Sequence, residues 1–176
     1  MALAHAILAS LVESSCSGYD LAKKFDGSVG FFWAASHQQI YRELSKLENQ
    51  GWITPETILL PGRPDKKLYS VTELGRKHLK SWIAEPSEPT AIKDDILVKI
   101  FAGYIASPST ILEEIKRHSE AHQKRLVTYQ KIQQQYFQNP QQLSEQAKFQ
   151  HLTLLNGIGY ETYWLAWCDE AIKLLG

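Results

Sequence analysis

The sequence lacks several features that would assign a protein to a class at once. Its two cysteines, Cys16 and Cys168, lie far apart with no second cysteine near either, which excludes a disulfide framework and a CxxC metal site. No apolar run approaches the roughly 20 residues that span a bilayer. The apolar start has no preceding basic residues and is interrupted by Glu13 and Asp20, unlike a signal peptide. We therefore expect a cytoplasmic protein in a reducing compartment, with no membrane segment.

Net charge is also absent. The 176 residues carry 19 Lys and Arg against 19 Asp and Glu, so the formal net charge is zero. A neutral total disfavours a nucleic-acid-binding protein, because such domains are usually strongly basic. Intrinsic disorder is disfavoured too, since 44% of the residues are hydrophobic. The length suits one larger domain or two small ones.

The first half has apolar residues at helical spacing. These spacings predict helices over residues 2–12, over about 17–26 with Ser17 as its cap, and over about 36–50. In the third helix, Ser36 and Gln39 have the spacing of a capping box, and Gly51 is a natural C-terminal stop. Its buried stripe is expected to comprise Ile40, Leu44 and Leu47.

A change of pattern follows the third helix. Residues 52–60 and 66–72 are strand-like and flank the turn-like run 61–65, which predicts a β-hairpin. Thr72 then caps a fourth helix that reaches about Ala84. The apolar side of this helix is expected to comprise Leu74, Leu79, Trp82 and Ile83. Residues 14–18 are expected to form a turn.

Two prolines in residues 85–89 mark the best boundary, which predicts one domain over 1–85 and a helical one over 90–176. Helices are expected over 94–105, 107–138 and 144–175. The second of these has a weak heptad, in which three of eight seam positions are polar. In the last, Gly157 and Gly159 either let another helix approach closely or mark a kink. We expect this helix to be mostly buried, against its own domain or a second chain.

Three helices followed by a two-stranded wing are the layout of a winged helix-turn-helix, so the fold class is mainly α with a small β-hairpin. Residues 62–80 carry six basic side chains against two acidic ones, a local charge of +4 that the total conceals. Basic side chains of a wing can reach DNA phosphates, and Gln or Arg on the third helix can read bases. The candidate DNA-binding residues are Tyr19, Ser36, His37, Gln38, Gln39, Tyr41, Arg42, Lys46, Gly62, Arg63, Lys66 and Lys67.

A simpler interpretation, without DNA contact, is open for several of these residues. Gln38, Arg42 and Lys46 could merely solvate a helix surface. Tyr41 could belong to the core or contact a phosphate, and the ring of Tyr19 is expected to pack while its hydroxyl faces a phosphate.

Four separated segments resemble the PadR family of bacterial transcriptional regulators. They are residues 2–8 (ALAHAIL), 17–21 (SGYDL), 31–44 (FFWAASHQQIYREL) and 62–72 (GRPDKKLYSVT). The C-terminal half is similar to the longer, AphA-like or virulence-activator-type members in its helical plan. The resemblance implies a homodimer joined by the C-terminal helices that binds a roughly palindromic operator and usually represses. In some members a small aromatic or phenolic effector releases the DNA.

Two further groups of residues have both a functional and a simpler structural interpretation. The aromatic set Trp82, Tyr160, Tyr163, Trp164 and Trp167 could line an effector pocket, but aromatic residues at helical spacing more often form core or interface. Glu114, His118 and His122 could line one helix face as metal ligands, but they do not form HExxH, and a solvated or dimer-facing stripe is the preferred interpretation.

We expect no metal, no cofactor and no catalysis. Residues 157–159 begin like a dinucleotide fingerprint, but Thr162 occupies the third glycine position. The rival to DNA binding is a winged-helix module that binds protein instead, which the neutral total charge supports.

Overall fold

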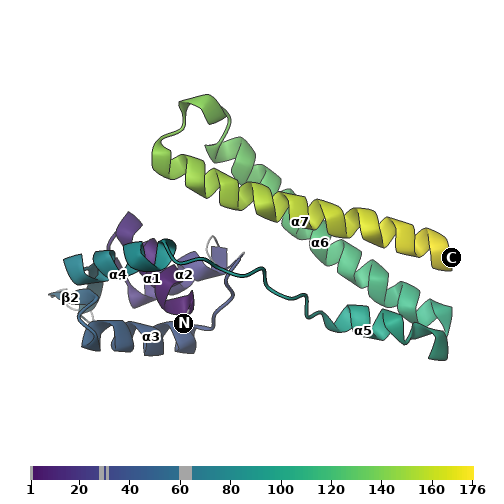
Figure 1. Ribbon diagram of the computed structural model, residues 1–176, viewed down its shortest axis with the longest axis horizontal. Helices are drawn as coiled ribbons and strands as arrows, with labels where there is room; N and C mark the ends of the chain where they lie inside the picture. The colour runs from purple at the N-terminus through teal and green to yellow at the C-terminus, as the bar shows by residue number, and fades with distance from the viewer. Residues whose placement is uncertain (1, 28–29, 31, 60–64) are drawn as a thin grey trace. The chain divides into compact units, whose positions relative to one another are not determined.

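The computed structural model describes residues 2–27, 30, 32–59 and 65–176, and the chain divides into two compact units, Met1–Pro89 and Thr90–Gly176 (Figure 1). The first unit contains, in order, α1 (Ala2–Glu13), β1 (Cys16–Ser17), α2 (Gly18–Gly27), α3 (His37–Asn49), β2 (Ile53–Ile58), β3 (Lys66–Val71) and α4 (Glu73–Ile83). The second contains α5 (Asp95–Phe101), η2 (Gly103–Ile105), α6 (Pro108–Tyr136), η3 (Pro140–Gln142) and α7 (Glu145–Leu175). The predicted class, mainly helical with an N-terminal winged helix-turn-helix, is confirmed.

The core of the first unit forms where α1, α2 and α3 meet the sheet. The predicted stripe of α3 is confirmed, since Ile40, Leu44 and Leu47 are all buried. They pack with apolar side chains from every neighbouring element. The other large members of this core are Ile7, Leu8, Leu11, Leu21, Phe25, Ile53, Tyr69 and Leu79.

The sheet has three antiparallel strands in the order β1-β3-β2. The hairpin of β2 and β3 is confirmed and runs from the pair Ile53 and Val71 to the pair Ile58 and Lys66. The expectation of a turn over residues 14–18 is wrong in part, because Cys16 pairs with Tyr69 as part of β1. A strand of two residues is too short to show the alternation that identifies strands in a sequence.

Both ends of α3 form as predicted. The Ser36 hydroxyl accepts a hydrogen bond from the backbone N–H of Gln39 at 3.2 Å, and the Gln39 Oε1 accepts one from the backbone N–H of Ser36 at 2.8 Å. This reciprocal pair is a capping box, which satisfies two backbone donors that a helix start leaves open. Gly51 follows the helix at a φ of 70°, a conformation that glycine adopts without strain.

The helix α4 differs from its prediction in which face is buried. Thr72 caps it as expected, accepting from the backbone N–H of Gly75 at 3.1 Å. Leu79 is buried, but Leu74 and Ile83 are exposed at 55% and 69%, so the predicted apolar side is wrong in part. The first turn of α4 packs so closely that a Cβ on Gly75 would lie 2.1 Å from the carbonyl oxygen of Trp52.

In the second unit the long helices α6 and α7 lie side by side in opposite directions (Figure 1). Four of the predicted heptad positions of α6 are buried, while Tyr136 is 63% exposed. The buried four are Ile115, His122, Leu126 and Tyr129. They face α7, whose own buried residues are His151, Glu161, Trp164 and Cys168.

One glycine of α7 sets how closely the two helices approach. A Cβ on Gly157 would lie 3.0 Å from Cε2 of Tyr129, whereas a Cβ on Gly159 would meet nothing within 4 Å. The close-approach alternative therefore holds at Gly157. The unbroken span of α7 from Glu145 to Leu175 shows no helix break at this point.

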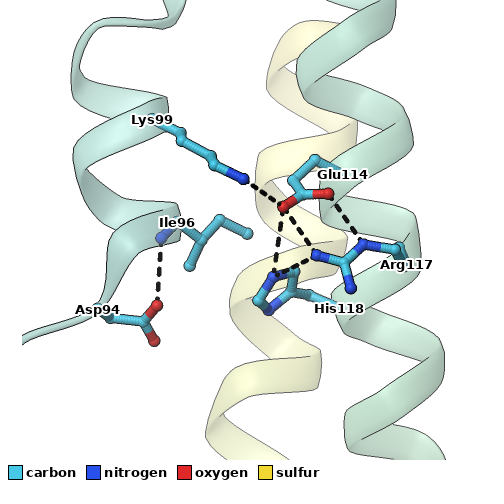
Figure 2. Close-up of polar contacts among 6 residues, drawn as sticks. All are labelled: Asp94, Ile96, Lys99, Glu114, Arg117 and His118. Carbon is cyan, nitrogen blue, oxygen red and sulfur yellow. Dashed lines mark hydrogen bonds and ion pairs between the residues drawn. The ribbon is translucent and has the colours of Figure 1, made fainter.

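A short helix, α5, docks on α6 through one buried side chain and one ion pair. Ile96 is 2% exposed, and Asp94 caps the helix by accepting from the backbone N–H of Ile96 at 3.2 Å. Lys99 pairs with Glu114 of α6 at 3.0 Å (Figure 2). The single helix expected over 94–105 is wrong in part, because α5 ends at Phe101 and a separate 3₁₀ turn follows.

Candidate nucleic-acid interface

The polar side of α3 is exposed opposite its buried stripe. The predicted residues of this helix and its cap are all exposed: Ser36, His37, Gln38, Gln39, Tyr41, Arg42 and Lys46. Two of them hold the helix together, because the side chains of Ser36 and Gln39 form the capping box. The remaining five present amide, imidazole, phenol and cationic groups from one rigid element, which suits contact with base edges and phosphates.

The helix α2 packs against α3 through a glycine and a tyrosine. A Cβ on Gly18 would lie 2.6 Å from Cε1 of Tyr41, so any larger residue would have to push this ring aside. Tyr41 remains 46% exposed, so part of its ring stays accessible while another part packs on α2. Tyr19 is 57% exposed, with the Lys23 ammonium 4.7 Å from its ring centroid, so its ring is less packed than expected.

Ion pairs tie the wing to these two helices. Lys66 at the start of β3 lies 2.8 Å from the carboxylate of Asp20 in α2. Lys67, the next residue, lies 3.2 Å from the carboxylate of Glu48 in α3. The structure thus brings both wing lysines to the helix-turn-helix. The predicted contacts Gly62 and Arg63 lie outside the described residues.

The local electrostatics follow from these pairs. Hydrogen bonds from Lys66 and then from Ser17 hold the pKa of Asp20 below its ordinary value. Lys46 of α3 has a carboxylate partner as well, Glu43, at 3.0 Å. Lys46, Lys66 and Lys67 therefore each lie beside a carboxylate.

The aromatic residues predicted to line an effector pocket fall into both units. Trp82 belongs to the first unit, where its ring stacks on His5 at 4.0 Å between centroids. On α7, Trp164 is buried and meets the ring of Trp167 edge to face at 5.1 Å. Tyr160 and Tyr163, also on α7, are exposed at 52% and 67%.

A buried polar cluster between α6 and α7 was not predicted from the sequence. His122 Nδ1 lies 2.5 Å from Oε2 of Glu161, and both side chains are at most 5% exposed. The ring of His122 also stacks on Trp164 at 4.6 Å. The interpretation of His122 as solvated or dimer-facing is therefore wrong, because α7 covers it. The sequence signal that could have indicated this cluster is the lone carboxylate of Glu161 among apolar and aromatic residues.

A second histidine contact, within the first unit, was also missed. The Nε2 atoms of His5 in α1 and His78 in α4 lie 3.1 Å apart, and Trp52 stacks on His78 at 3.6 Å. Spacing could not indicate this pair, because its members are 73 residues apart.

The described residues hold neither a metal cluster nor a membrane-spanning helix. In the ranges given above, no three His, Cys, Asp or Glu side chains are gathered so that they could hold a metal ion. Within the same part of the chain, every helix is too short or too polar to cross a membrane.

Comparison with known proteins gives consistent matches along the chain. The family described as "Transcriptional regulator PadR-like family" matches residues 7–81, and "Virulence activator alpha C-term" matches residues 92–176. The probable transcriptional regulator Rv1176c of Mycobacterium tuberculosis is 41% identical over 185 residues, covering 99% of this chain and 98% of that protein. The negative transcriptional regulator PadR of Bacillus subtilis is 28% identical over 176 residues, covering 98% and 97%.

Solved structures agree with these matches. The virulence activator AphA of Vibrio cholerae superposes with a TM-score of 0.79 at 34% identity, covering 98% of this chain and 97% of that one. Bacillus subtilis PadR in complex with operator DNA gives a TM-score of 0.86 at 25% identity, covering all of both chains. Its complex with p-coumaric acid gives 0.80 at 26%, covering 99% of both. With two matched families and a relative 41% identical over almost its whole length, the chain belongs to the PadR-like family of transcriptional regulators.

Proposed function

We propose that the protein binds double-stranded DNA, with α3 in the major groove and the wing against the backbone. The observation that carries this proposal is the exposed polar face of α3, held by its capping box beside the lysines of β3. Gln38 and Arg42 are the proposed base readers, and Lys46, Lys66 and Lys67 the proposed phosphate contacts. The similarity over the full chain to PadR in complex with operator DNA supports the proposal.

The protein acts as a homodimer on a palindromic operator, joined by the helices of the second unit. Large apolar side chains there are left exposed in the single chain, among them Phe101 at 87%, Ile105 at 78% and Leu174 at 86%. Exposed apolar groups in such number favour burial against another surface. A two-fold dimer places its recognition helices about 34 to 36 Å apart, or at a multiple of that spacing, to match the half-sites.

In this proposal the protein represses transcription in the cytoplasm, and a small aromatic effector releases it from DNA. The relative described as a negative transcriptional regulator supports repression, and its complex with p-coumaric acid supports a planar aromatic ligand. On α7, Tyr160, Tyr163, Trp164 and Trp167 are the proposed aromatic contacts. Titration with phenolic acids should quench Trp fluorescence saturably. Absence of saturable quenching with every planar aromatic compound tested would reject the proposed effector.

Selecting the genomic DNA fragments that the protein retains tests DNA binding and identifies the operator. The purified full-length protein is mixed with random genomic fragments at low salt, and the retained fragments are sequenced. Enrichment of a palindromic sequence, lost in Gln38→Ala with Arg42→Ala, is the expected result. Retention of no DNA at any salt concentration would reject the proposal and favour the alternative, a winged-helix module that binds protein.

A further inference from the structure

The three lysines proposed to contact phosphates all have a carboxylate partner within the protein. The pairs come from α2, α3 and β3, and their N–O distances fall between 2.8 and 3.2 Å. They are Lys46 with Glu43, Lys66 with Asp20, and Lys67 with Glu48.

Each carboxylate is either partly buried or held by a further hydrogen bond. The side chains of Glu43 and Glu48 are only 19% and 32% exposed. Lys67 Nζ bonds both carboxylate oxygens of Glu48, at 3.2 and 3.3 Å. Asp20 accepts a further hydrogen bond from the Ser17 hydroxyl at 2.8 Å, which fixes it at the start of α2.

An ammonium group that a carboxylate neutralises attracts phosphate less. Phosphate contacts supply most of the affinity for non-specific DNA, because they carry no sequence information. Base contacts from Gln38 and Arg42 remain available while the lysines are paired. A non-specific complex has no base contacts, so it depends wholly on these weakened phosphate contacts.

We propose that Asp20, Glu43 and Glu48 act as internal substitutes for DNA phosphate and raise the specificity of the protein for its operator. The inference rests on the proposed DNA binding. In the free protein each carboxylate neutralises one lysine of the DNA-facing surface. On the operator, well-placed base contacts hold the duplex close enough for phosphates to displace the carboxylates, whereas non-specific duplexes lack that help.

The test removes the three charges while keeping the shapes of the side chains. The full-length variant Asp20→Asn, Glu43→Gln, Glu48→Gln is compared with the wild type on the selected operator and on a scrambled duplex, across salt concentrations. Affinity for the scrambled duplex should rise about tenfold or more near 0.1 M salt, and the salt slope should steepen by about one to three. The ratio of operator to scrambled affinity should fall.

The matched control removes three charges elsewhere in the first unit. Glu73→Gln, Glu85→Gln, Glu88→Gln changes the net charge equally, and all three residues are exposed. It should change scrambled-duplex affinity less than about twofold. An equal effect of both triple variants would overturn the inference, because net charge alone would then explain it.

The outcomes separate the inference from the proposed function. If the wild type binds its operator and the amide variant keeps the same scrambled affinity and slope, the inference fails while DNA binding stands. If neither protein binds any duplex, both fail. Because Asp20 also helps to cap α2, the double variant Glu43→Gln, Glu48→Gln leaves that cap intact and should show the same changes at about two thirds of the size.

Discussion

Glu161 is buried in the middle of α7, with 2% of its surface exposed. Burying a carboxylate is costly unless charged or hydrogen-bonding partners replace water. Glu161 has two such partners on α6, since His122 contacts Oε2 and the Arg125 guanidinium lies 3.6 Å from Oε1. The cluster therefore joins α6 to α7 at a defined register.

Removing this carboxylate should destabilise the second unit strongly. Glu161→Ala is expected to lower the free energy of unfolding by about 3 to 5 kcal/mol, because it leaves a buried partner without its counterpart. Chemical denaturation measures the loss. The control Glu170→Ala, exposed on the same helix, should cost no more than about 0.5 kcal/mol. Similar losses for the two variants would contradict a stabilising role for the cluster.

Glu114 is a second carboxylate with several partners, but it lies at the surface. The Arg117 guanidinium donates to both of its oxygens, at 2.9 and 2.8 Å, and Lys99 bonds it from α5 (Figure 2). These hydrogen bonds, that from Arg117 first, lower the pKa of Glu114 from 4.5 to about 2. The charged carboxylate of Glu114 therefore stabilises the folded state.

This shift predicts a pH dependence with a definite sign. Between pH 4.5 and about 2 the unfolded chain binds a proton at Glu114 more readily than the folded chain does. The stability from Glu114 is thus complete above pH 4.5 and is lost as the pH falls toward 2. Thermal unfolding should show a lower Tm for Glu114→Gln at pH 6, with the gap to the wild type closing near pH 2. A gap that stays constant over this range would refute the linkage, and Glu113→Gln, exposed beside it, is the control.

The pairing of α6 with α7 depends on a small residue where the helices touch. Tyr129 is 3% exposed and its ring lies over Gly157. Glycine normally weakens a helix, so its presence at a contact is explained by the space the partner ring needs. Gly159, two residues on, has no such neighbour.

Identical substitutions at these two glycines should therefore differ. Gly159→Ala should raise the free energy of unfolding by about 0.5 to 1 kcal/mol through helix propensity. Gly157→Ala should give no gain, and Gly157→Leu should cost about 1 to 3 kcal/mol by forcing Tyr129 away. Urea denaturation of the three variants measures this. Equal gains from both alanines would show that the helices do not approach closely at Gly157.

Among the residues that the structure describes, more of the large exposed apolar side chains lie in the second unit than in the first. Those of the second unit include Phe101, Tyr104, Ile105, Phe149, Tyr163 and Leu174. The first unit, by contrast, encloses a larger core of buried residues. A second copy of the chain is the proposed cover for the exposed groups.

Charges placed among these groups should separate the proposed dimer. Phe101→Glu with Ile105→Glu is expected to shift the mass in solution from twice 20.1 kDa toward 20.1 kDa, because the interface would have to bury two carboxylates from each chain. Analytical ultracentrifugation over a concentration series measures the change. Leu59→Glu, at a position 75% exposed in the first unit, should leave the mass unchanged. A wild type that sediments as a monomer would contradict the proposed dimer.

The features that could be predicted from the sequence depend on neighbouring residues. The caps at Ser36 and Thr72, the α3 stripe and the β2–β3 hairpin formed as expected, because helix periodicity and capping act over three or four positions. The four separated motifs also indicated the family. The same periodicity also predicted which side chains of α3 face away from the core.

Contacts between distant residues were decided only by the tertiary structure. Glu161 meets His122 across 39 positions and Lys67 meets Glu48 across 19, so no local pattern could pair them. The two-residue strand β1 exists because β3 offers it backbone partners. The neutral composition was known from the sequence, but the placement of its carboxylates beside the lysines of the wing and α3 depends on how α2, α3 and β3 pack.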